Sequence, residues 1–335
     1  MLKFPPQSYI IKTGKSKCRH ENCKEKGVDL LDRKNTDNDQ WIVNIDFSQL
    51  MDLRVDYAFK LLWTTGDTLY LISLLNAIFA NKKIPRIIKS LTIMNPYLER
   101  HSKEDKLSIL DIRARLDDGS TTLIEMHLYD LDDLKYKTIR SWARAYGEEI
   151  NSSEKYSTQP PVICVAFANG SLDGSESQKI HKCCKIMDID DCTIFSDAME
   201  LHYIDMNAYV KVINETGGIK KGITEETMLA NWLAIITEKD IEDKSIIKNI
   251  CEEQEEICMA VSALVRLSED KIARQEYLRR QDDIMLYNKR ARNYELMKQS
   301  AEQEKNRAEQ AENRAEQAEA EIETLRKRLA ELEAK

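Results

Sequence analysis

The last third of the chain most constrains its fold, because glycine and proline are absent from every position after Gly222. These residues are the strongest helix breakers, so a stretch of more than a hundred residues without them favours continuous helix. We predict a small helical bundle over residues 223–268 and one long helix over residues 269–335.

The long helix carries a seven-residue repeat, which is clearest over residues 301–335. Its a positions are Ala301, Ala308, Ala315, Ile322 and Leu329, and its d positions are Glu304, Ala311, Ala318, Leu325 and Leu332. A heptad repeat with apolar a and d positions is typical of a left-handed coiled coil. Because alanine buries little apolar surface, the end from Ile322 to Leu332 would supply most of the association energy.

The charges of the repeat predict how two such helices run. In a parallel pair, position g of one helix faces position e of the next heptad of its partner. These pairs are Arg307 with Glu312, Arg314 with Glu319, Glu321 with Arg326, and Arg328 with Glu333, all opposite in sign. They predict a parallel homodimer. The alternative is a single charged helix, which Glu304 at a d position and the five alanines of the seam favour.

The composition is that of a globular cytoplasmic protein. Apolar residues make up 42% of the chain, but no stretch approaches the roughly 20 apolar residues that span a bilayer. Pro5 and Pro6 interrupt the start where a secretory signal needs an apolar run. We therefore expect no membrane association and reduced cysteines. The net charge of -8 does not decide for or against a nucleic-acid partner, because local patches steer binding.

Residues 1–45 are predicted to form a polar N-terminal arm, because they lack sustained hydrophobic periodicity. Cys18, His20 and Cys23 lie within this arm. Three residues do not complete a tetrahedral zinc site, and no second Cys/His pair follows at finger spacing. The arm is therefore expected to be flexible and metal-free.

Residues 46–222 alternate helical and extended patterns, which predicts an α/β domain. Helices are predicted over 56–62, 67–81 and 133–150, and extended segments over 87–96, 107–115, 121–128, 162–167, 193–195 and 201–204. The Asp118-Gly119 pair between two of the strands is a turn signal, so these strands form a β-hairpin.

Two acidic residues lie on adjoining strands of this hairpin. Asp111 and Glu125 come close together if both side chains point to one face, and His127 shares the face of Glu125. Two carboxylates form a hard oxygen site suited to Mg²⁺, which would activate water for phosphodiester hydrolysis. Taken alone, these residues are more typical of a solvent-exposed acidic strand face.

Four segments strengthen the metal-site interpretation: DYAFKLL from Asp56, LLNAIF from Leu74, LDIRARLDDG from Leu110 and IEMHL from Ile124. Together with YKTIRSWARAY and PVICVAF, and over residues 46–209, they resemble the Rpn type of recombination-promoting nucleases and transposases. This family is a branch of the PD-(D/E)XK superfamily. The resemblance implies a mixed sheet flanked by helices, Mg²⁺ (or Mn²⁺) dependence and cleavage of double-stranded DNA.

The resemblance also implies roles for individual residues. Asp111 and Glu125 match the metal-binding pair, Asp56 matches a further acidic residue, and His127 stands where the family has Gln and the superfamily has Lys. The residues expected to contact DNA are basic: Lys60, Lys135, Lys137, Arg140 and Arg144, with Lys82, Lys83, Arg86 and Lys89 as a second cluster. Basic clusters of this kind are also common on ordinary solvated surfaces.

Further departures from the family are Trp63 to Gly66 in place of Phe-Gly, and LHYIDMNAYV in place of an ending with Glu-Leu-Pro-Lys. The leading hypothesis is a metal-dependent DNA endonuclease, dimeric through its C-terminal helix, with Asp111, Glu125 and His127 as its catalytic residues. The alternatives are a catalytically degraded relative that serves as a DNA-binding or oligomeric scaffold, and a purely structural coiled-coil protein.

Overall fold

The computed structural model describes residues 45–65, 67–80, 86–95, 111–128, 133–150, 155–170, 179–217 and 225–333. Most of the predicted N-terminal arm, with Cys18, His20 and Cys23, lies outside the described residues, as do Lys82 and Lys83.

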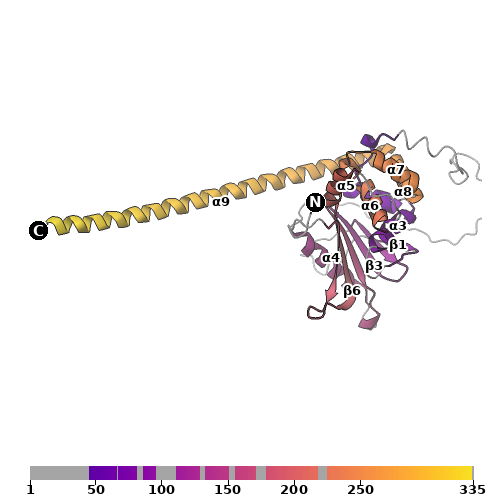
Figure 1. Ribbon diagram of the computed structural model, residues 1–335, viewed down its shortest axis with the longest axis horizontal. Coiled ribbons are helices and arrows are strands. Elements are labelled where there is room, and N and C mark those ends of the chain that lie inside the picture. Colours follow the sequence, from indigo (N-terminus) through magenta and orange to yellow (C-terminus); the bar gives the residue numbers. More distant parts are fainter. Residues whose placement is uncertain are drawn as a thin grey trace, which may run out of the picture.

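A mixed six-stranded sheet forms the centre of the described part of the chain, in the order β1-β2-β3-β4-β6-β5 (Figure 1). The strands are β1 Leu91–Met94, β2 Ile112–Leu116, β3 Thr121–His127, β4 Val162–Ala168, β5 His181–Met187 and β6 Ile194–Asp205. The pairs β3–β4 and β4–β6 are parallel, and the other pairs are antiparallel. The predicted α/β class is therefore confirmed.

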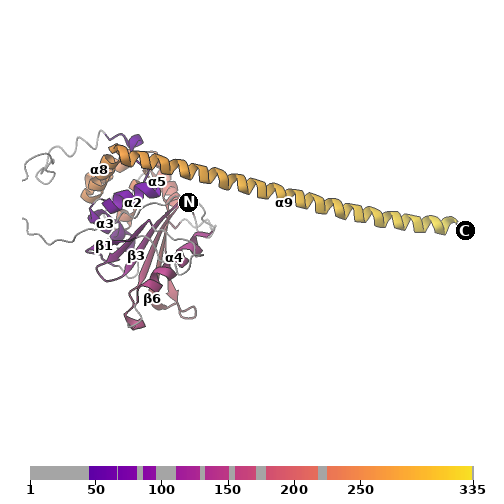
Figure 2. The ribbon, with the colours of Figure 1, turned by 180° about the vertical axis from the view of Figure 1, so that it is seen from behind.

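Helices cover both faces of this sheet. Their bounds are α2 Asp56–Thr65, α3 Thr68–Ala80, α4 Leu134–Glu148, α5 Met206–Thr216, α6 Glu225–Ile236, α7 Ser245–Glu253, α8 Glu255–Glu269 and α9 Lys271–Glu333, with 3₁₀ turns at Phe47–Gln49, Tyr156–Thr158 and Glu238–Asp240. Among the described helices, α4 packs on one face, over β4 and β6. The main helical layer, including α2, α3, α6 and α8, packs on the other face (Figures 1 and 2).

The burial of strand β4 explains why helices pack on both faces of the sheet. All seven of its residues are buried, as expected for a parallel strand between two layers. Val165 and Phe167 join the large core below the main helical layer, whereas Cys164 and Ala166 join a smaller cluster below α4 that includes Trp142. The large core also contains Trp232 of α6, which packs edge-on against Trp63 of α2 with 5.3 Å between ring centroids. Residues of the predicted bundle, 223–268, thus share one core with residues of the 46–222 range.

The predicted β-hairpin is present as β2 and β3. Gly119 has φ +86°, a left-handed conformation that glycine adopts without strain, and its N–H donates to the carbonyl of Leu116. The Leu116 N–H in turn donates to the Ser120 carbonyl at 2.9 Å, which closes a three-residue loop. This turn fixes the register of the two strands.

The far edge of the sheet differs from the sequence-based expectation. The two short strands predicted near 193–195 and 201–204 form a single strand, β6, and it pairs with β5, which was not predicted. The β5 sequence HKCCKIM lacks a regular apolar alternation, because this edge strand is partly exposed. Helix α5 was also missed, although Asp205 caps its N-terminus and Gly217 ends it in a left-handed conformation.

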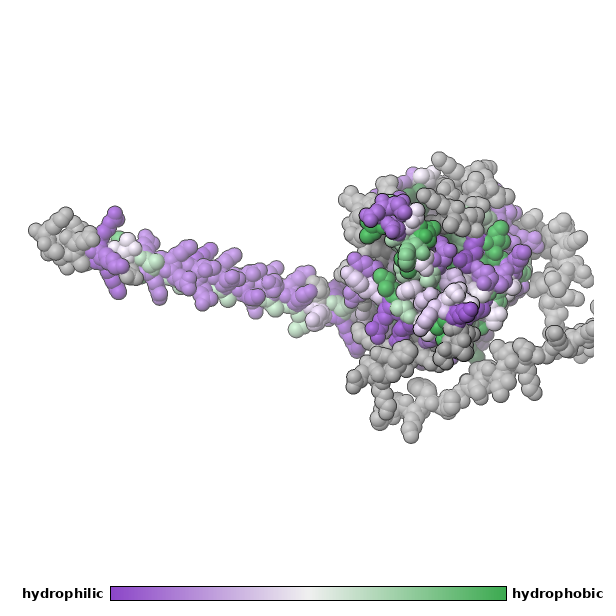
Figure 3. All heavy atoms as spheres, turned by 90° about the horizontal axis from the view of Figure 1, so that it is seen from below, coloured by the Kyte–Doolittle hydropathy of each residue, from purple (hydrophilic) through white to green (hydrophobic). Residues whose placement is uncertain are grey.

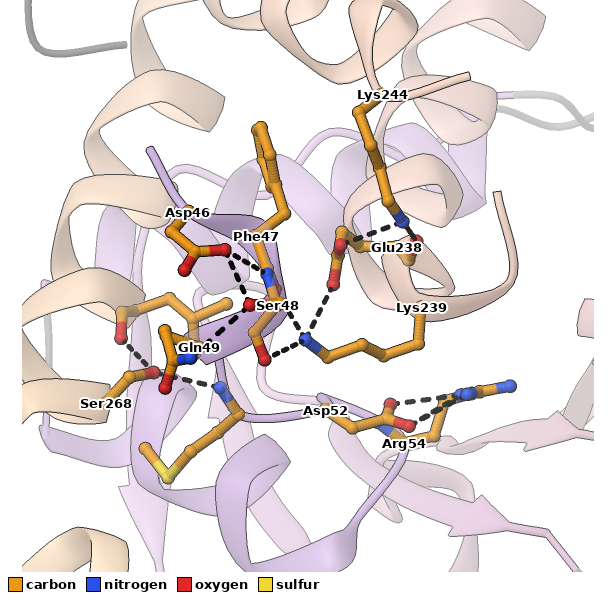
Figure 4. A network of polar contacts seen from close by, with 12 residues as sticks. Asp46, Phe47, Ser48, Gln49, Asp52, Arg54, Glu238, Lys239, Lys244 and Ser268 are labelled. Atoms are coloured by element: carbon orange, nitrogen blue, oxygen red, sulfur yellow. Dashed lines mark hydrogen bonds and ion pairs between the residues drawn. The ribbon is translucent and has the colours of Figure 1, made fainter. Parts of the chain in front are cut away.

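The segment before α2 is hydrogen-bonded to helical segments about two hundred residues away in sequence (Figure 4). The Lys239 ammonium donates to the carbonyl of Phe47 at 2.6 Å, and the Met51 N–H donates to the Ser268 hydroxyl oxygen at 2.9 Å. These contacts hold the start of α2, and with it Asp56, at one end of the sheet.

Helix α9 comprises 63 residues. Its first turns pack on the body, and the rest extends away from it as a single rod (Figures 1 and 2). Tyr277 anchors its first turns: its side chain is buried, and its hydroxyl accepts hydrogen bonds from the Asp52 N–H at 3.0 Å and from Gln281 at 2.7 Å. Among the described helices, none combines the length and apolar character needed to cross a membrane.

We predict that Tyr277→Phe lowers the free energy of unfolding by about 1–2 kcal/mol, because it leaves the partly buried Asp52 N–H without its acceptor. Urea denaturation followed by circular dichroism measures this change. The matched control is Tyr294→Phe on the exposed part of α9, which should leave stability unchanged. Equal effects of the two substitutions would contradict the anchoring role of Tyr277.

Candidate active site

The hairpin register brings the two predicted metal ligands together. Ile112 of β2 pairs with Ile124 of β3, so the next position along places Asp111 opposite Glu125. The Oδ2 atom of Asp111 accepts a hydrogen bond from the backbone N–H of Met126 at 2.6 Å. This bond holds the Asp111 carboxylate beside the end of β3. Both residues lie where β3 ends, the edge at which α/β folds commonly bind ligands.

Glu125 is the centre of a buried polar cluster. Its side chain is 6% exposed, and its Oε2 atom lies 2.8 Å from His127 Nε2. Its Oε1 atom accepts a hydrogen bond from the Ser141 hydroxyl at 3.1 Å, and the Lys137 ammonium lies 3.8 Å from Oε2. Helix α4 supplies both Ser141 and Lys137, so its packing on this sheet face completes the cluster.

A pocket of about 760 Å³ opens over these residues. Asp111, Glu125 and His127 line it from the hairpin, Asp56 from α2 and Lys137 from α4. Its remaining lining includes residues of α9, namely Arg280, Asp283, Ile284, Leu286, Tyr287 and Arg290. The long helix therefore forms one wall of the pocket.

The two central carboxyl groups have pKa values displaced in opposite directions. Burial, helped by the nearby charges of Asp56 and Glu125, raises the pKa of Asp111 to about 7 against the opposing hydrogen bond from Met126. Burial would raise the pKa of Glu125, but the hydrogen bond from His127 and the charge of Lys137 outweigh this effect. The pKa of Glu125 is therefore lowered. Pairs displaced in this way are typical of catalytic sites.

The side chains present fit a hard divalent cation. Asp111 and Glu125 offer carboxylate oxygens at the pocket surface, and their mutual repulsion is relieved when a cation lies between them. Asp56 is engaged differently, since its carboxylate forms a two-pronged ion pair with Arg280 at 2.7 Å to Nε and 2.5 Å to Nη2. Of the three carboxylates, Asp56 is thus the one held by an arginine of α9.

The predicted DNA-contacting residues are found in different environments. Lys135 and Arg140 are exposed on α4, and Lys60 is partly exposed on α2. Arg144 is only 9% exposed, so it offers little surface to a large ligand. In the second cluster, Arg86 bonds Asp118 and the Ser120 hydroxyl of the hairpin turn, the latter at 2.8 Å.

The residues that sequence reasoning missed come mainly from α9. Arg280 lies 224 positions from its partner Asp56, and no local motif relates the two. The only available signal is that Arg280 and Arg290 are basic and Tyr287 aromatic on a helix expected to be solvated. Ser141 was missed because a serine within a helix carries no pattern of its own.

A mixed sheet with two carboxylates opposed across a hairpin and a basic helix beside them defines a nuclease-like α/β class. The model of the PD-(D/E)XK nuclease family transposases matches residues 53–289, well over half of the chain, and the chain belongs to this family. The match extends into α9 past Arg280 and Tyr287, and it ends before the heptads. No curated protein and no solved structure matched the chain.

The raised pKa of Asp111 makes stability depend on pH. A carboxyl group whose pKa is about 7 when folded and near 3.8 when unfolded holds its proton more tightly in the folded state. The free energy of unfolding should therefore fall as pH rises from about 4 to 7, by on the order of a few kcal/mol.

We predict that Asp111→Asn, which retains an oxygen for the Met126 N–H, removes much of this fall. Denaturation in EDTA at several pH values measures it, and the variant should gain stability over wild type above pH 7. A parallel pH dependence of the two proteins would contradict the assignment to Asp111.

Proposed function

We propose that the chain is a Mg²⁺- or Mn²⁺-dependent DNA endonuclease of a transposase-associated, recombination-promoting type. It hydrolyses phosphodiester bonds of double-stranded DNA. The observation that carries this proposal is that Asp111, Glu125, His127 and Lys137 line one pocket, within a chain of the nuclease family.

Each residue of the pocket has its own role in the proposed reaction. Asp111 and Glu125 would hold the cation, which supplies charge stabilisation to the phosphate and lowers the pKa of water. An ionised Glu125 accepts a hydrogen bond from Nε2–H of His127, which leaves Nδ1 of the neutral ring as a proton acceptor. His127 thus accepts the proton of the attacking water, and the Lys137 ammonium offsets negative charge on the phosphate.

DNA is held through its backbone. Lys135, Lys137 and Arg140 are exposed on α4, and Arg280 and Arg290 of α9 line the same pocket as Lys137. Basic side chains around a pocket bind phosphates and position the duplex without reading its sequence. The protein acts in the cytoplasm, where thiols such as those of Cys164 and Cys251 stay reduced.

One observation favours the alternative of a degraded nuclease that binds DNA without cutting it. The Arg280 guanidinium holds Asp56, and Glu125 is already bonded by His127 and Ser141, so these carboxylates are stabilised without a metal ion. Cleavage assays separate the two functions.

We predict that the protein nicks supercoiled plasmid in Mg²⁺ or Mn²⁺, and that Asp111→Ala and Glu125→Ala abolish nicking because each removes a metal ligand. His127→Ala should slow it by about 10²-fold or more, as for loss of a general base. The control is Asp190→Ala in the exposed β5–β6 turn, which should cut normally.

Two outcomes would count against this assignment. DNA binding by wild type without cleavage would favour the scaffold, and cleavage that survives both carboxylate substitutions would place the active site elsewhere. Gel-shift measurements on the same proteins distinguish loss of binding from loss of chemistry.

A parallel homodimer through residues 301–335 is part of the proposal. The outer part of α9 presents a mainly hydrophilic surface with a few apolar side chains (Figure 3). Ile322 and Leu325, at a and d positions, are 49% and 57% exposed on the single chain. Pairing two helices would bury these side chains, while the g and e charges select the parallel orientation.

We predict that light scattering after size exclusion gives a dimer for the full chain and a monomer for a chain that ends at Ser300. Ile322→Asp should give the same change without truncation, because it places charge within the seam. The matched control is Lys327→Asp at an f position outside the seam, which should remain dimeric. An unchanged mass on truncation would mean that the outer part of α9 is a solitary charged helix.

A further inference from the structure

A second group of chemically active side chains lies at the far edge of the sheet, on strands β5 and β6. Cys183 pairs directly with His202 across the two strands, and Glu200 is two residues from His202 on the same strand face. One ligand atom of each residue lies within 4.8 Å of the others. The antiparallel register therefore gathers a thiol, an imidazole and a carboxylate at one point.

The distances within the group are short. His202 Nε2 lies 2.7 Å from Glu200 Oε1, and Cys183 Sγ lies 3.9 Å from the same oxygen. His202 is fully buried and Glu200 nearly so, whereas Cys183 is partly exposed. An ion could thus approach from the Cys183 side and reach two ligands that are otherwise shielded from water.

Neighbouring side chains orient two of the three residues, His202 and Glu200. His202 Nδ1 lies 2.9 Å from His181 Nε2, so the ring can donate Nδ1–H there and present Nε2 as an electron pair. The Lys185 ammonium lies 3.1 Å from Glu200 Oε2, which leaves Oε1 directed toward Cys183 and His202. Supporting contacts of this kind accompany metal ligands, since they fix the tautomer of the ring and the orientation of the carboxylate.

We propose that Cys183, Glu200 and His202 bind a zinc ion. A thiolate, an imidazole and a carboxylate are each common zinc ligands, and Mg²⁺ and Ca²⁺ do not favour sulfur or nitrogen. Three protein ligands leave the fourth tetrahedral position to water. On binding, Cys183 releases its thiol proton to solvent, and His202 keeps one proton on Nδ1.

The site is separate from the nuclease pocket. His202 lies against Phe79 of α3, with 5.1 Å between ring centroids, and therefore on the face covered by the main helical layer. Glu125 and His127 alternate with Ile124 and Met126 and point to the α4 face. The zinc ion would instead fasten the edge strand β5 to β6, next to the irregular register at Lys185 and Ile186.

Cobalt substitution tests the proposal on the full chain. Co²⁺ added to the reduced, metal-free protein should produce the near-ultraviolet thiolate-to-cobalt band and the visible bands of tetrahedral coordination, and Zn²⁺ should displace both. Because carboxylates alone do not give the thiolate band, binding in the nuclease pocket does not contribute. The Cys183→Ser variant should lose this band.

Two control variants make the test specific. Cys184→Ser changes the adjacent exposed thiol, and Cys18→Ser with Cys23→Ser removes the N-terminal cysteines; both proteins should keep the band. Glu200→Gln retains the thiolate and should weaken Co²⁺ affinity at least about tenfold.

Zinc should also raise the melting temperature of wild type by more than that of Cys183→Ser, because the variant keeps only the nuclease pocket for the ion. Circular dichroism without metal verifies that each variant is folded. A thiolate band in Cys183→Ser equal to that of wild type, or no band in wild type, would overturn the proposal.

Discussion

The register between β2 and β3 is the constraint on which the proposed chemistry depends. Pairing of Ile112 with Ile124 sets Asp111 against Glu125, and the Met126 N–H then binds the Asp111 carboxylate. A slip of one residue would turn Glu125 and His127 into the apolar core on the other face of the sheet. The left-handed Gly119 in the turn excludes such a slip, so a glycine at the opposite end of the hairpin maintains the pocket.

Sequence reasoning succeeded where the determinants are local. The hairpin, α4 and the buried strand β4 follow from turn residues and periodicity that span only a few positions, and the hairpin brings Asp111, Glu125 and His127 to one pocket. Their role as catalytic residues stays a prediction. The wall that α9 contributes could not be predicted, because Arg280 meets Asp56 only after the whole domain has folded. Strand β5 was not predicted for a different reason. Its polar side chains contact other polar side chains of the sheet, so its sequence carries only a weak hydrophobic pattern.

The two faces of the sheet use buried polar residues in similar ways. On the α4 face, Glu125 is bonded by His127 two residues later on the same strand, and on the other face Glu200 is bonded by His202 with the same spacing. In both cases a lysine lies beside the carboxylate, Lys137 in the first and Lys185 in the second. A buried carboxylate needs such partners, since burial alone strongly disfavours its ionised form.

Helix α9 is both a wall of the pocket and the start of the proposed coiled coil, with no break in the helix between the two. A continuous α-helix turns by about 100° for each residue. If two chains pair as proposed, the number of residues between Arg290 and the first heptad therefore sets whether each pocket faces toward or away from the partner chain. Inserting or deleting residues in this connector would reorient the pockets in such a dimer while leaving each pocket intact.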